Sequence, residues 1–179
     1  AMAAILGADR DKAQQIADAA AEGEVCSVAN DNDPGQVVIS GAKAAVERAV
    51  PLAKEMGAKR AVLLPVSAPF HCPLMQPAAD VMQKTLADAQ LRAPLVPVYA
   101  NVTAAPVADP DTIRALLVEQ VTGMVRWRES VLAMAEAGVT DFIELGGKVL
   151  APMVKRTAAD SEQTSVVTMD DIEALAKRL

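Results

Sequence analysis

The sequence has 179 residues, a length that suits one medium domain or two small subdomains with a buried core. Hydrophobic residues make up 52% of the chain and aromatic residues 2%, which excludes a disordered chain and predicts an aliphatic core. The formal net charge of −6 comes without a basic stripe, and no apolar run has the length of a membrane span. Nucleic acid and membrane are therefore not expected partners.

The sequence contains two cysteines, Cys26 and Cys72. They lie far apart, so their spacing indicates neither a disulfide framework nor a metal site. Free thiols favour a reducing compartment, and no signal peptide is visible. We therefore expect a cytoplasmic location.

Residues 1–66 alternate between short apolar runs and segments with helical spacing. Asp9 can cap the first helix, and the turn-forming residues 30–35 separate two strand candidates, which predicts a hairpin. The expected order is strand, helix, strand, strand, helix, strand, over residues 2–6, 10–21, 25–29, 36–40, 42–56 and 61–66. This is the split βαβ, or ferredoxin-like, arrangement, and it can form a small subdomain alone.

Residues 67–179 form the second predicted part, which begins with a proline-rich bend at 68–73. Helices are expected over residues 75–91, 109–121, 127–137 and 148–157, the first with an apolar face of Ala78, Met82, Leu86 and Ala89. A last helix should be capped by Asp170 and Glu173, with Leu179 on its apolar face. Strands are expected over residues 96–101, 141–145 and 166–167, and the second of them is of the buried type. Alternating strands and helices predict a parallel α/β sheet, and three strands are so few that they should belong to a larger sheet.

His71 is the only histidine, and it lies on the bend between a predicted strand and a predicted helix. A histidine at that place can act as a general base near neutral pH, or it can be a loop residue without a role. Cys72 would need a base that reaches its sulfur, and adjacent side chains point apart. A small buried thiol is the simpler interpretation of Cys72 and Cys26.

Other polar positions carry weaker signals. Gly146 and Gly147, at a strand-to-helix turn, could present backbone N–H groups to an anion, or they could serve only tight packing. Turn formation accounts for Asn30 and Asn32, and Gln120 reads as a solvated side chain at the end of a helix. The sequence contains no GxSxG elbow, Walker A loop or complete GxGxxG motif. The residues alone thus predict a fold and one candidate histidine.

Four segments together resemble the bacterial malonyl-CoA:acyl carrier protein transacylases: residues 28–41, 66–75, 98–102 and 144–150. Their order and spacing match essentially the whole chain. The resemblance implies that residues 1–66 are a ferredoxin-like subdomain inserted into an α/β-hydrolase-like acyltransferase core. Residues 67–179 would then be the C-terminal part of that core, with its other strands upstream.

The resemblance also implies a reaction that needs no cofactor. A serine takes the malonyl group from coenzyme A and passes it to the phosphopantetheine thiol of acyl carrier protein. His71 matches the base of that family, and Gln120 matches the residue whose main-chain carbonyl orients it. Asn30 and Asn32 match asparagines that line the site. Phe70 matches the aromatic position that narrows the pocket and favours malonyl over branched acyl groups.

The chain departs from that family in two ways. Asp33 stands where the family usually has a small residue, and no GHSxG serine occurs in the sequence. The nucleophile is therefore expected upstream or on a second chain, and this chain alone should be inactive. Two alternatives stay open: a non-catalytic ferredoxin-like binding module, and a fragment that only binds acyl carrier protein. A basic docking site for that acidic partner could include Lys148, Lys155 and Arg156, which a solvated helix face also explains.

Overall fold

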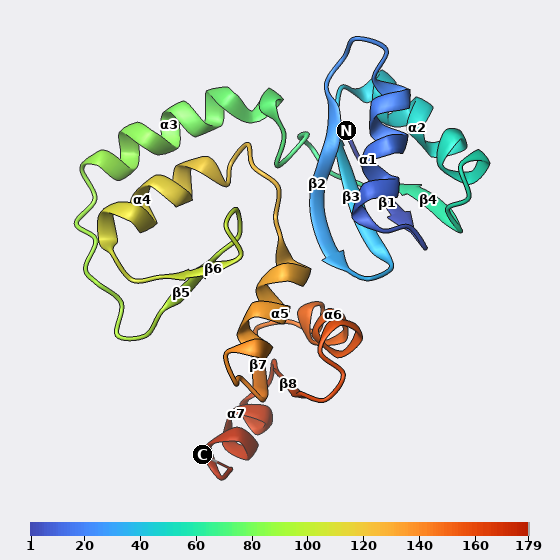
Figure 1. Cartoon of the computed structure of the whole chain (residues 1–179). Helices are drawn as coiled ribbons and strands as arrows, with labels where there is room; N and C mark the ends of the chain where they lie inside the picture. Colours follow the sequence, from blue (N-terminus) through green and yellow to red (C-terminus); the bar gives the residue numbers. More distant parts are fainter. Residues whose placement is uncertain (179) are drawn as a thin grey trace. The chain divides into compact units, whose positions relative to one another are not determined.

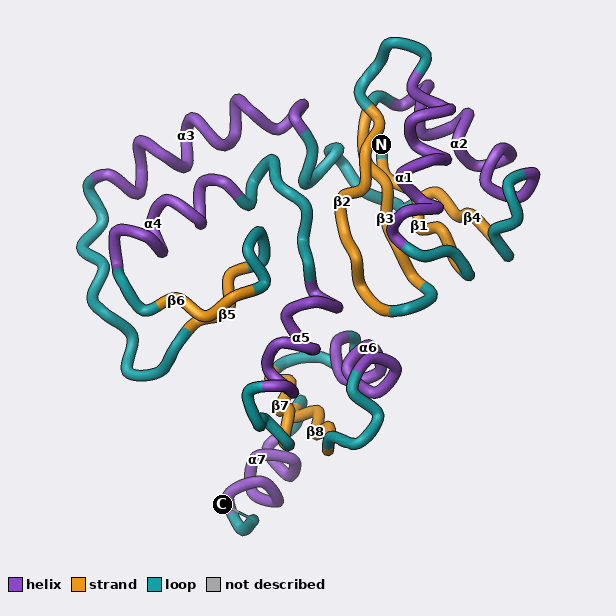
Figure 2. The backbone as a smooth tube through the Cα atoms, in the orientation of Figure 1, coloured by secondary structure: helices purple, strands orange, loops and turns teal. Residues whose placement is uncertain are grey.

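The computed structural model describes residues 1–178 (Figures 1 and 2). Contacts divide the chain into two compact units, Ala1–Ser130 and Val131–Leu179, which are described here one at a time. The division predicted from the sequence, between residues 66 and 67, stays a prediction. Among the described residues, no helix is long and apolar enough to cross a membrane.

The first unit begins with a four-stranded antiparallel sheet in the order β2-β3-β1-β4. Its elements alternate as expected from the sequence: β1 (Met2–Leu6), α1 (Arg10–Ala21), β2 (Cys26–Asp33), β3 (Gln36–Gly41), α2 (Lys43–Glu55) and β4 (Arg60–Leu63). Helices α1 and α2 contact each other and cover one face of the sheet (Figure 1). The order confirms the ferredoxin-like arrangement.

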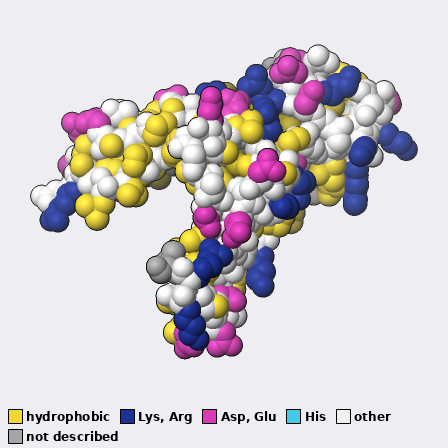
Figure 3. All heavy atoms as spheres, turned by 60° about the horizontal axis from the view of Figure 1, so that its bottom comes forward, with side chains coloured by type: hydrophobic (Ala, Val, Ile, Leu, Met, Phe, Trp, Pro, Cys, Tyr) yellow, Lys and Arg dark blue, Asp and Glu magenta, His cyan; other side chains and the backbone are white. Residues whose placement is uncertain are grey.

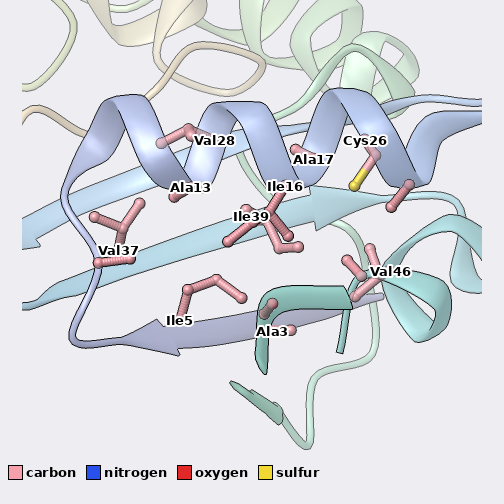
Figure 4. Close-up of a cluster of buried hydrophobic side chains, with 14 of the residues drawn as sticks. Ala3, Ile5, Ala13, Ile16, Ala17, Cys26, Val28, Val37, Ile39 and Val46 are labelled. Atoms are coloured by element: carbon pink, nitrogen blue, oxygen red, sulfur yellow. The ribbon is translucent and has the colours of Figure 1, made fainter. Parts of the chain in front are cut away.

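The core of this subdomain lies between the sheet and the two helices (Figure 4). Asp9 caps α1 by accepting a hydrogen bond from the Lys12 amide at 2.8 Å, so the helix starts where its apolar face begins. Ile5, Ile16 and Ile39 are fully buried there. Burial of each such side chain contributes about 1.5–3 kcal/mol relative to exposure, which identifies this cluster as the main source of stability in the subdomain.

Strand β2 is longer than expected, because it continues to Asp33 through the segment predicted as a turn. The turn itself is only Pro34–Gly35. The added residues pair with β3, from Asn30 opposite Val38 to Asp33 opposite Gln36. Val125 lies on the other side of this stretch: its amide donates to Ala29 O at 2.8 Å and its carbonyl accepts from the Asp31 amide at 2.9 Å. The hairpin is therefore tighter than predicted, and turn propensity gave the wrong local structure for Asn30 and Asn32. The buried Asp33 side chain accepts from the Gly35 amide at 2.9 Å, which closes the short turn.

The remainder of unit 1 is η1 (Pro73–Met75), α3 (Gln76–Ala87), β5 (Val98–Ala100), β6 (Ala105–Val107) and α4 (Pro110–Glu119), with the start of α5 (Trp127–Glu136). Strand β5 was expected in a parallel sheet, but it pairs antiparallel with β6, a strand that was not expected from the sequence. The intervening residues form a tight turn in which the Ala104 amide donates to Ala100 O at 2.9 Å. In the described residues, β5 therefore pairs with the next strand of a local hairpin and not with a distant parallel strand.

The apolar face predicted for α3 is not buried in unit 1. On the predicted face, Ala78 and Met82 are exposed and Leu86 is half-buried, whereas the one buried residue of the helix is Ala79. Leu95 and Val96, which precede β5, are also exposed, with relative accessibilities of 103% and 70%. Figure 3 shows many hydrophobic side chains at the surface of the face that it presents. The helical spacing of α3 was correct, but its contacts within unit 1, to η1 and α4, leave much of this face open.

The second unit contains β7 (Asp141–Leu145), α6 (Leu150–Thr157), β8 (Glu162–Val166) and α7 (Met169–Ala176). Strands β7 and β8 are parallel, as expected. Strand β7 was expected to be buried, yet its residues alternate between exposed and half-buried. Helix α7 is capped by Thr168 and Asp171, which bond each other's backbone amides, and not by the expected Asp170 and Glu173. Leu179, placed on the apolar face of the last helix, lies outside the described residues.

Candidate functional site

His71 is half-buried on the bend between β4 and η1, and its Nδ1 lies 2.8 Å from the main-chain oxygen of Gln120. A carbonyl oxygen can only accept a hydrogen bond, so Nδ1 must carry the proton in this contact. This assignment leaves Nε2 with a free lone pair. The geometry therefore produces an imidazole whose second nitrogen is ready to accept a proton.

The backbone at His71 is left-handed, with φ 58°. A side-chain-bearing residue in that region costs about 1–3 kcal/mol and persists only where its surroundings hold it. Here the next residue, Cys72, is fully buried and its Sγ donates to Pro69 O at 3.1 Å. The Cys72 carbonyl accepts from the Met75 amide at 3.0 Å as η1 begins. Cys72 thus anchors the bend that presents His71.

The other cysteine, Cys26, is also buried, and burial raises the pKa of its thiol to about 11. Burial opposes formation of the thiolate, which is the reactive form of cysteine. The structure places both thiols in packed surroundings, in line with their interpretation as small buried side chains.

Gln120 is the C-cap residue of α4, where the last carbonyls have no partner within the helix and are free to bond other groups. Its main-chain oxygen accepts from His71, and its side-chain Oε1 accepts from Nδ2 of Asn101 at 2.9 Å. The structure therefore brings together His71 and Gln120, two residues singled out in the sequence. Asn101 is a third member of the network that was not predicted.

Asn30 and Asn32 are half-buried on β2, and the residues between and after them, Asp31 and Asp33, are buried. Burial therefore alternates along this stretch, although the pairing with β3 shifts register between Val28 and Asn30 and between Asp31 and Asp33. Within the described residues, no hydrogen bond joins either asparagine to His71. Their expected place beside the histidine stays a prediction.

Asp31 forms an ion pair that the sequence did not indicate. Its carboxylate is 1% exposed and accepts from Nε of Arg128 at 3.0 and 3.1 Å, with Nη2 at 2.8 Å. The bond to Asp31 raises the pKa of Arg128 above its ordinary value. This pair holds β2 against the start of α5, and thereby fixes the strand that carries Asn30 and Asn32.

Glu129, the residue after Arg128, forms a second cluster of charged side chains. Glu129 accepts hydrogen bonds from Arg126 and, at 3.2 Å, from Arg10. The bonds from Arg126 are the main reason why the pKa of Glu129 lies below its ordinary value. The cluster joins α1 to the N-terminal turn of α5 within unit 1.

Phe70 precedes His71 and is 40% exposed, so its ring remains available to line a neighbouring space. A separate cavity of about 200 Å³ lies between the β5–β6 hairpin and α4, with Asn101 and Gln120 among its lining residues. The rest of its lining is mainly apolar and includes Val98, Val107, Ile113 and Leu117.

The turn at Gly146 and Gly147 contains a carboxylate of the chain itself, that of Glu144, which was not expected from the sequence. The Glu144 carboxylate accepts from the Val149 and Ala151 amides, each at 2.8 Å. These amides belong to the N-terminus of α6, which favours negative charge. Burial opposes ionisation of Glu144, but backbone hydrogen bonds from Leu150, Ala151 and Val149 outweigh it, and the pKa is lowered. The backbone amides that follow this turn therefore bind the Glu144 carboxylate of the same chain.

We expect acid to loosen this turn. The folded-state pKa of Glu144 is depressed, so its contribution is complete above the unfolded value of about 4.5 and is lost as the pH falls through the folded value. The protection factors of the Val149 and Ala151 amides, which compare the observed exchange rate with the intrinsic rate at the same pH, should therefore fall on acidification. In Glu144→Gln these protection factors should be lower at neutral pH and less dependent on pH. The exposed Glu173 provides a matched control, and an equal effect of Glu173→Gln would contradict the assignment.

The candidate site is a histidine whose ring is held through Nδ1, on a loop that follows the ferredoxin-like subdomain. Among the described residues, no nucleophilic side chain forms a hydrogen bond with His71. Such a histidine suits an enzyme that transfers acyl groups, provided that the nucleophile comes from residues other than those described. The comparisons agree with that class: the chain belongs to the acyl transferase domain family, whose profile matches residues 2–171.

Its relatives define the branch of the family. The chain is 46% identical over 180 residues to a malonyl CoA-acyl carrier protein transacylase from Haemophilus influenzae, covering 100% of the chain and 58% of that protein. It is 42% identical to the transacylase of the same name from Bacillus subtilis, covering 100% of the chain and 57% of that relative. The chain thus spans little more than half the length of these curated relatives. The expected resemblance is confirmed.

Solved structures agree with the fold. The acyl-carrier-protein-S-malonyltransferase of Bartonella henselae matches with a TM-score of 0.94 and 48% identity, over 99% of the chain and 57% of its own length. A malonyl-transacylase solved in complex with a type II polyketide acyl-carrier protein matches with a TM-score of 0.95 and 37% identity, over 99% and 58%. The expected fold class, a ferredoxin-like subdomain with part of an α/β-hydrolase-like core, is confirmed.

Proposed function

We propose that this chain is the histidine-bearing part of an enzyme that transfers malonyl from coenzyme A to the phosphopantetheine thiol of acyl carrier protein. The names of its relatives support the substrates. The contact between His71 Nδ1 and Gln120 O, at 2.8 Å, carries the assignment of the base. The same relatives support participation in fatty-acid or polyketide synthesis, and the location we propose is cytoplasmic.

The proposed chemistry has two symmetrical halves. Nε2 of His71 takes the proton from a serine hydroxyl, and the serine oxygen attacks the thioester carbonyl of malonyl-CoA. The tetrahedral intermediate expels the coenzyme A thiolate, which takes the proton from Nε2. In the second half, Nε2 deprotonates the phosphopantetheine thiol, whose sulfur attacks the acyl-serine, and the serine oxygen leaves with that proton. No cofactor is required.

The serine lies outside residues 1–179 in this proposal, because no GHSxG motif occurs among them. It belongs either to a segment that precedes this sequence or to a second chain, and the 179 residues alone are inactive. Gln120 fixes the ring of His71 through its main-chain carbonyl. Asn30 and Asn32 line the site, and the ring of Phe70 limits the space beside an α-methyl group.

Acyl carrier protein could bind the basic side chains of Lys148, Lys155 and Arg156. Lys155 and Arg156 lie in the last turn of α6, where cations complement the helix dipole. Nζ of Lys155 also donates to Ala159 O at 3.1 Å, so local helix stabilisation accounts for part of this group. The docking role would appear as a strong salt dependence of carrier-protein binding, and a binding constant independent of salt would exclude it.

The proposed function can be tested by mass spectrometry of the intact protein purified from its native source, before and after exposure to malonyl-CoA. We expect a malonyl adduct on a serine of a preceding segment or a companion chain, and release of the adduct to acyl carrier protein. Methylmalonyl-CoA offered in competition should be used less, and Phe70→Ser should reduce that preference. The part of the Haemophilus influenzae relative that this chain does not cover can be supplied as a second polypeptide or a fusion. If no adduct forms then, the proposal is wrong. A ferredoxin-like binding module without chemistry would then be the better hypothesis.

A further inference from the structure

We infer that Asn101 is a positioning residue for His71 and acts through the side chain of Gln120. The inference concerns the geometry of the ring, and its importance for catalysis rests on the function proposed above. Asn101 is half-buried directly after β5, 19 residues before Gln120 in sequence. Its Nδ2 donates to Oε1 of Gln120 at 2.9 Å, while the main-chain oxygen of the same glutamine accepts from His71.

Gln120 needs such an anchor because of its place in α4. It is the C-cap residue, and the ends of helices fray. A carbonyl that moves with a fraying end cannot hold an imidazole in one orientation. The bond from Asn101 ties the glutamine side chain to the β5–β6 hairpin, so the carbonyl acquires a second fixed point outside its own helix.

Asn101 is itself held in place. Its main-chain oxygen accepts from the Arg126 amide at 3.0 Å. Nη1 of Arg126 also donates to Val102 O and Thr103 O, each at 3.3 Å. The chain that leaves α4 therefore closes over the turn that carries Asn101.

Close packing reinforces this clamp. A Cβ added at Gly123 would lie 2.7 Å from Cγ1 of Val102, so the two segments already touch without space for a side chain. Gln120 is thus held at two points: its side chain contacts the hairpin and its main-chain carbonyl contacts His71. A displacement of about 1 Å in such a support can lower a catalysed rate by about 10²-fold.

The test uses this chain directly, because His71 is its only histidine and gives one set of imidazole ¹⁵N signals. In the parent chain we expect the tautomer with the proton on Nδ1 and slow exchange of that proton. Asn101→Leu removes the donor to Gln120 and keeps the number and branching of the side-chain heavy atoms. We expect it to populate both tautomers and to speed exchange of the Nδ1 proton.

Two variants separate positioning from general damage. In Asn101→Asp, the Gln120 amide can rotate and donate to the new carboxylate, so the parent tautomer should be retained. Thr103→Ala alters the same turn, where Oγ1 of Thr103 lies 3.5 Å from Ala100 O, and should leave the imidazole signals unchanged. If Asn101→Leu does not fold, Gln120→Leu removes the other partner of the bond, keeps the carbonyl and should give the same mixture of tautomers.

The readout does not depend on acyl transfer, so the inference and the proposed function can fail separately. Unchanged tautomer and exchange in a folded Asn101→Leu or Gln120→Leu chain would overturn the inference, as would an equal change in Thr103→Ala. In the enzyme completed with its serine segment, Asn101→Leu should lower kcat by about 10- to 10²-fold with little change in KM, and Asn101→Asp should restore most of the loss. A change confined to KM would also overturn it.

Discussion

Replacing His71 with asparagine should lower malonyl transfer in the completed enzyme by about 10²- to 10⁴-fold, the usual contribution of a positioned general base. Asparagine is the informative substitution because position 71 has φ 58°. Asparagine tolerates the left-handed region better than most residues, so the bend should keep its shape while the base is lost. The measurement is the rate of malonyl transfer from coenzyme A to acyl carrier protein, alongside the urea midpoint.

A comparison with His71→Ala separates chemistry from backbone strain. Alanine should lose the same activity and be less stable than His71→Asn, because asparagine tolerates the left-handed region better than alanine does. His71→Gly should relieve that strain, and added imidazole should restore part of its activity by entering the vacated space. Full transfer activity in His71→Asn would show that the base is another group and that the Nδ1 contact to Gln120 is only structural.

The ferredoxin-like order could be predicted because it depends on local signals. The helical spacing of Ala13, Ile16 and Ala17 and the cap at Asp9 are confirmed by the buried face and the start of α1. The extension of β2 was missed because its residues have high turn propensity, yet they pair with β3, and Val125 and Arg128, far along the chain, contact them as well. Asparagine and aspartate form turns in most settings, and here strand pairing and the distant partners outweighed that local preference.

The candidate site was partly accessible from the sequence. His71 could be identified as a candidate because it is the only histidine and follows a predicted strand. Gln120 could be singled out only through the family resemblance, because a main-chain carbonyl leaves no sequence signal. Asn101 and the pair of Asp31 with Arg128 were missed. Their partners are 19 and 97 residues away, and only the folded chain brings them together.

The second large effect should come from the ion pair that holds β2. Arg128→Met should destabilise the chain by about 3 kcal/mol, since it leaves the Asp31 carboxylate buried without its partner. Asp31 is 1% exposed, whereas the Arg128 side chain is 30% exposed. The reverse change, Asp31→Asn, leaves a cation that water can reach, and should cost only about 1–2 kcal/mol.

These values can be measured by urea unfolding followed through the single tryptophan, Trp127, next to Arg128. The double variant Asp31→Asn/Arg128→Met should be more stable than Arg128→Met alone, because it no longer buries an unpaired charge. Arg10→Met is the matched control, since Arg10 is 44% exposed and its pair with Glu129 should contribute at most about 1 kcal/mol. Equal destabilisation by Arg10→Met and Arg128→Met would mean that burial of Asp31 does not govern the strength of this contact. The strand that carries Asn30 and Asn32 would then be held mainly by its backbone pairing with β3, together with the bridge to Val125.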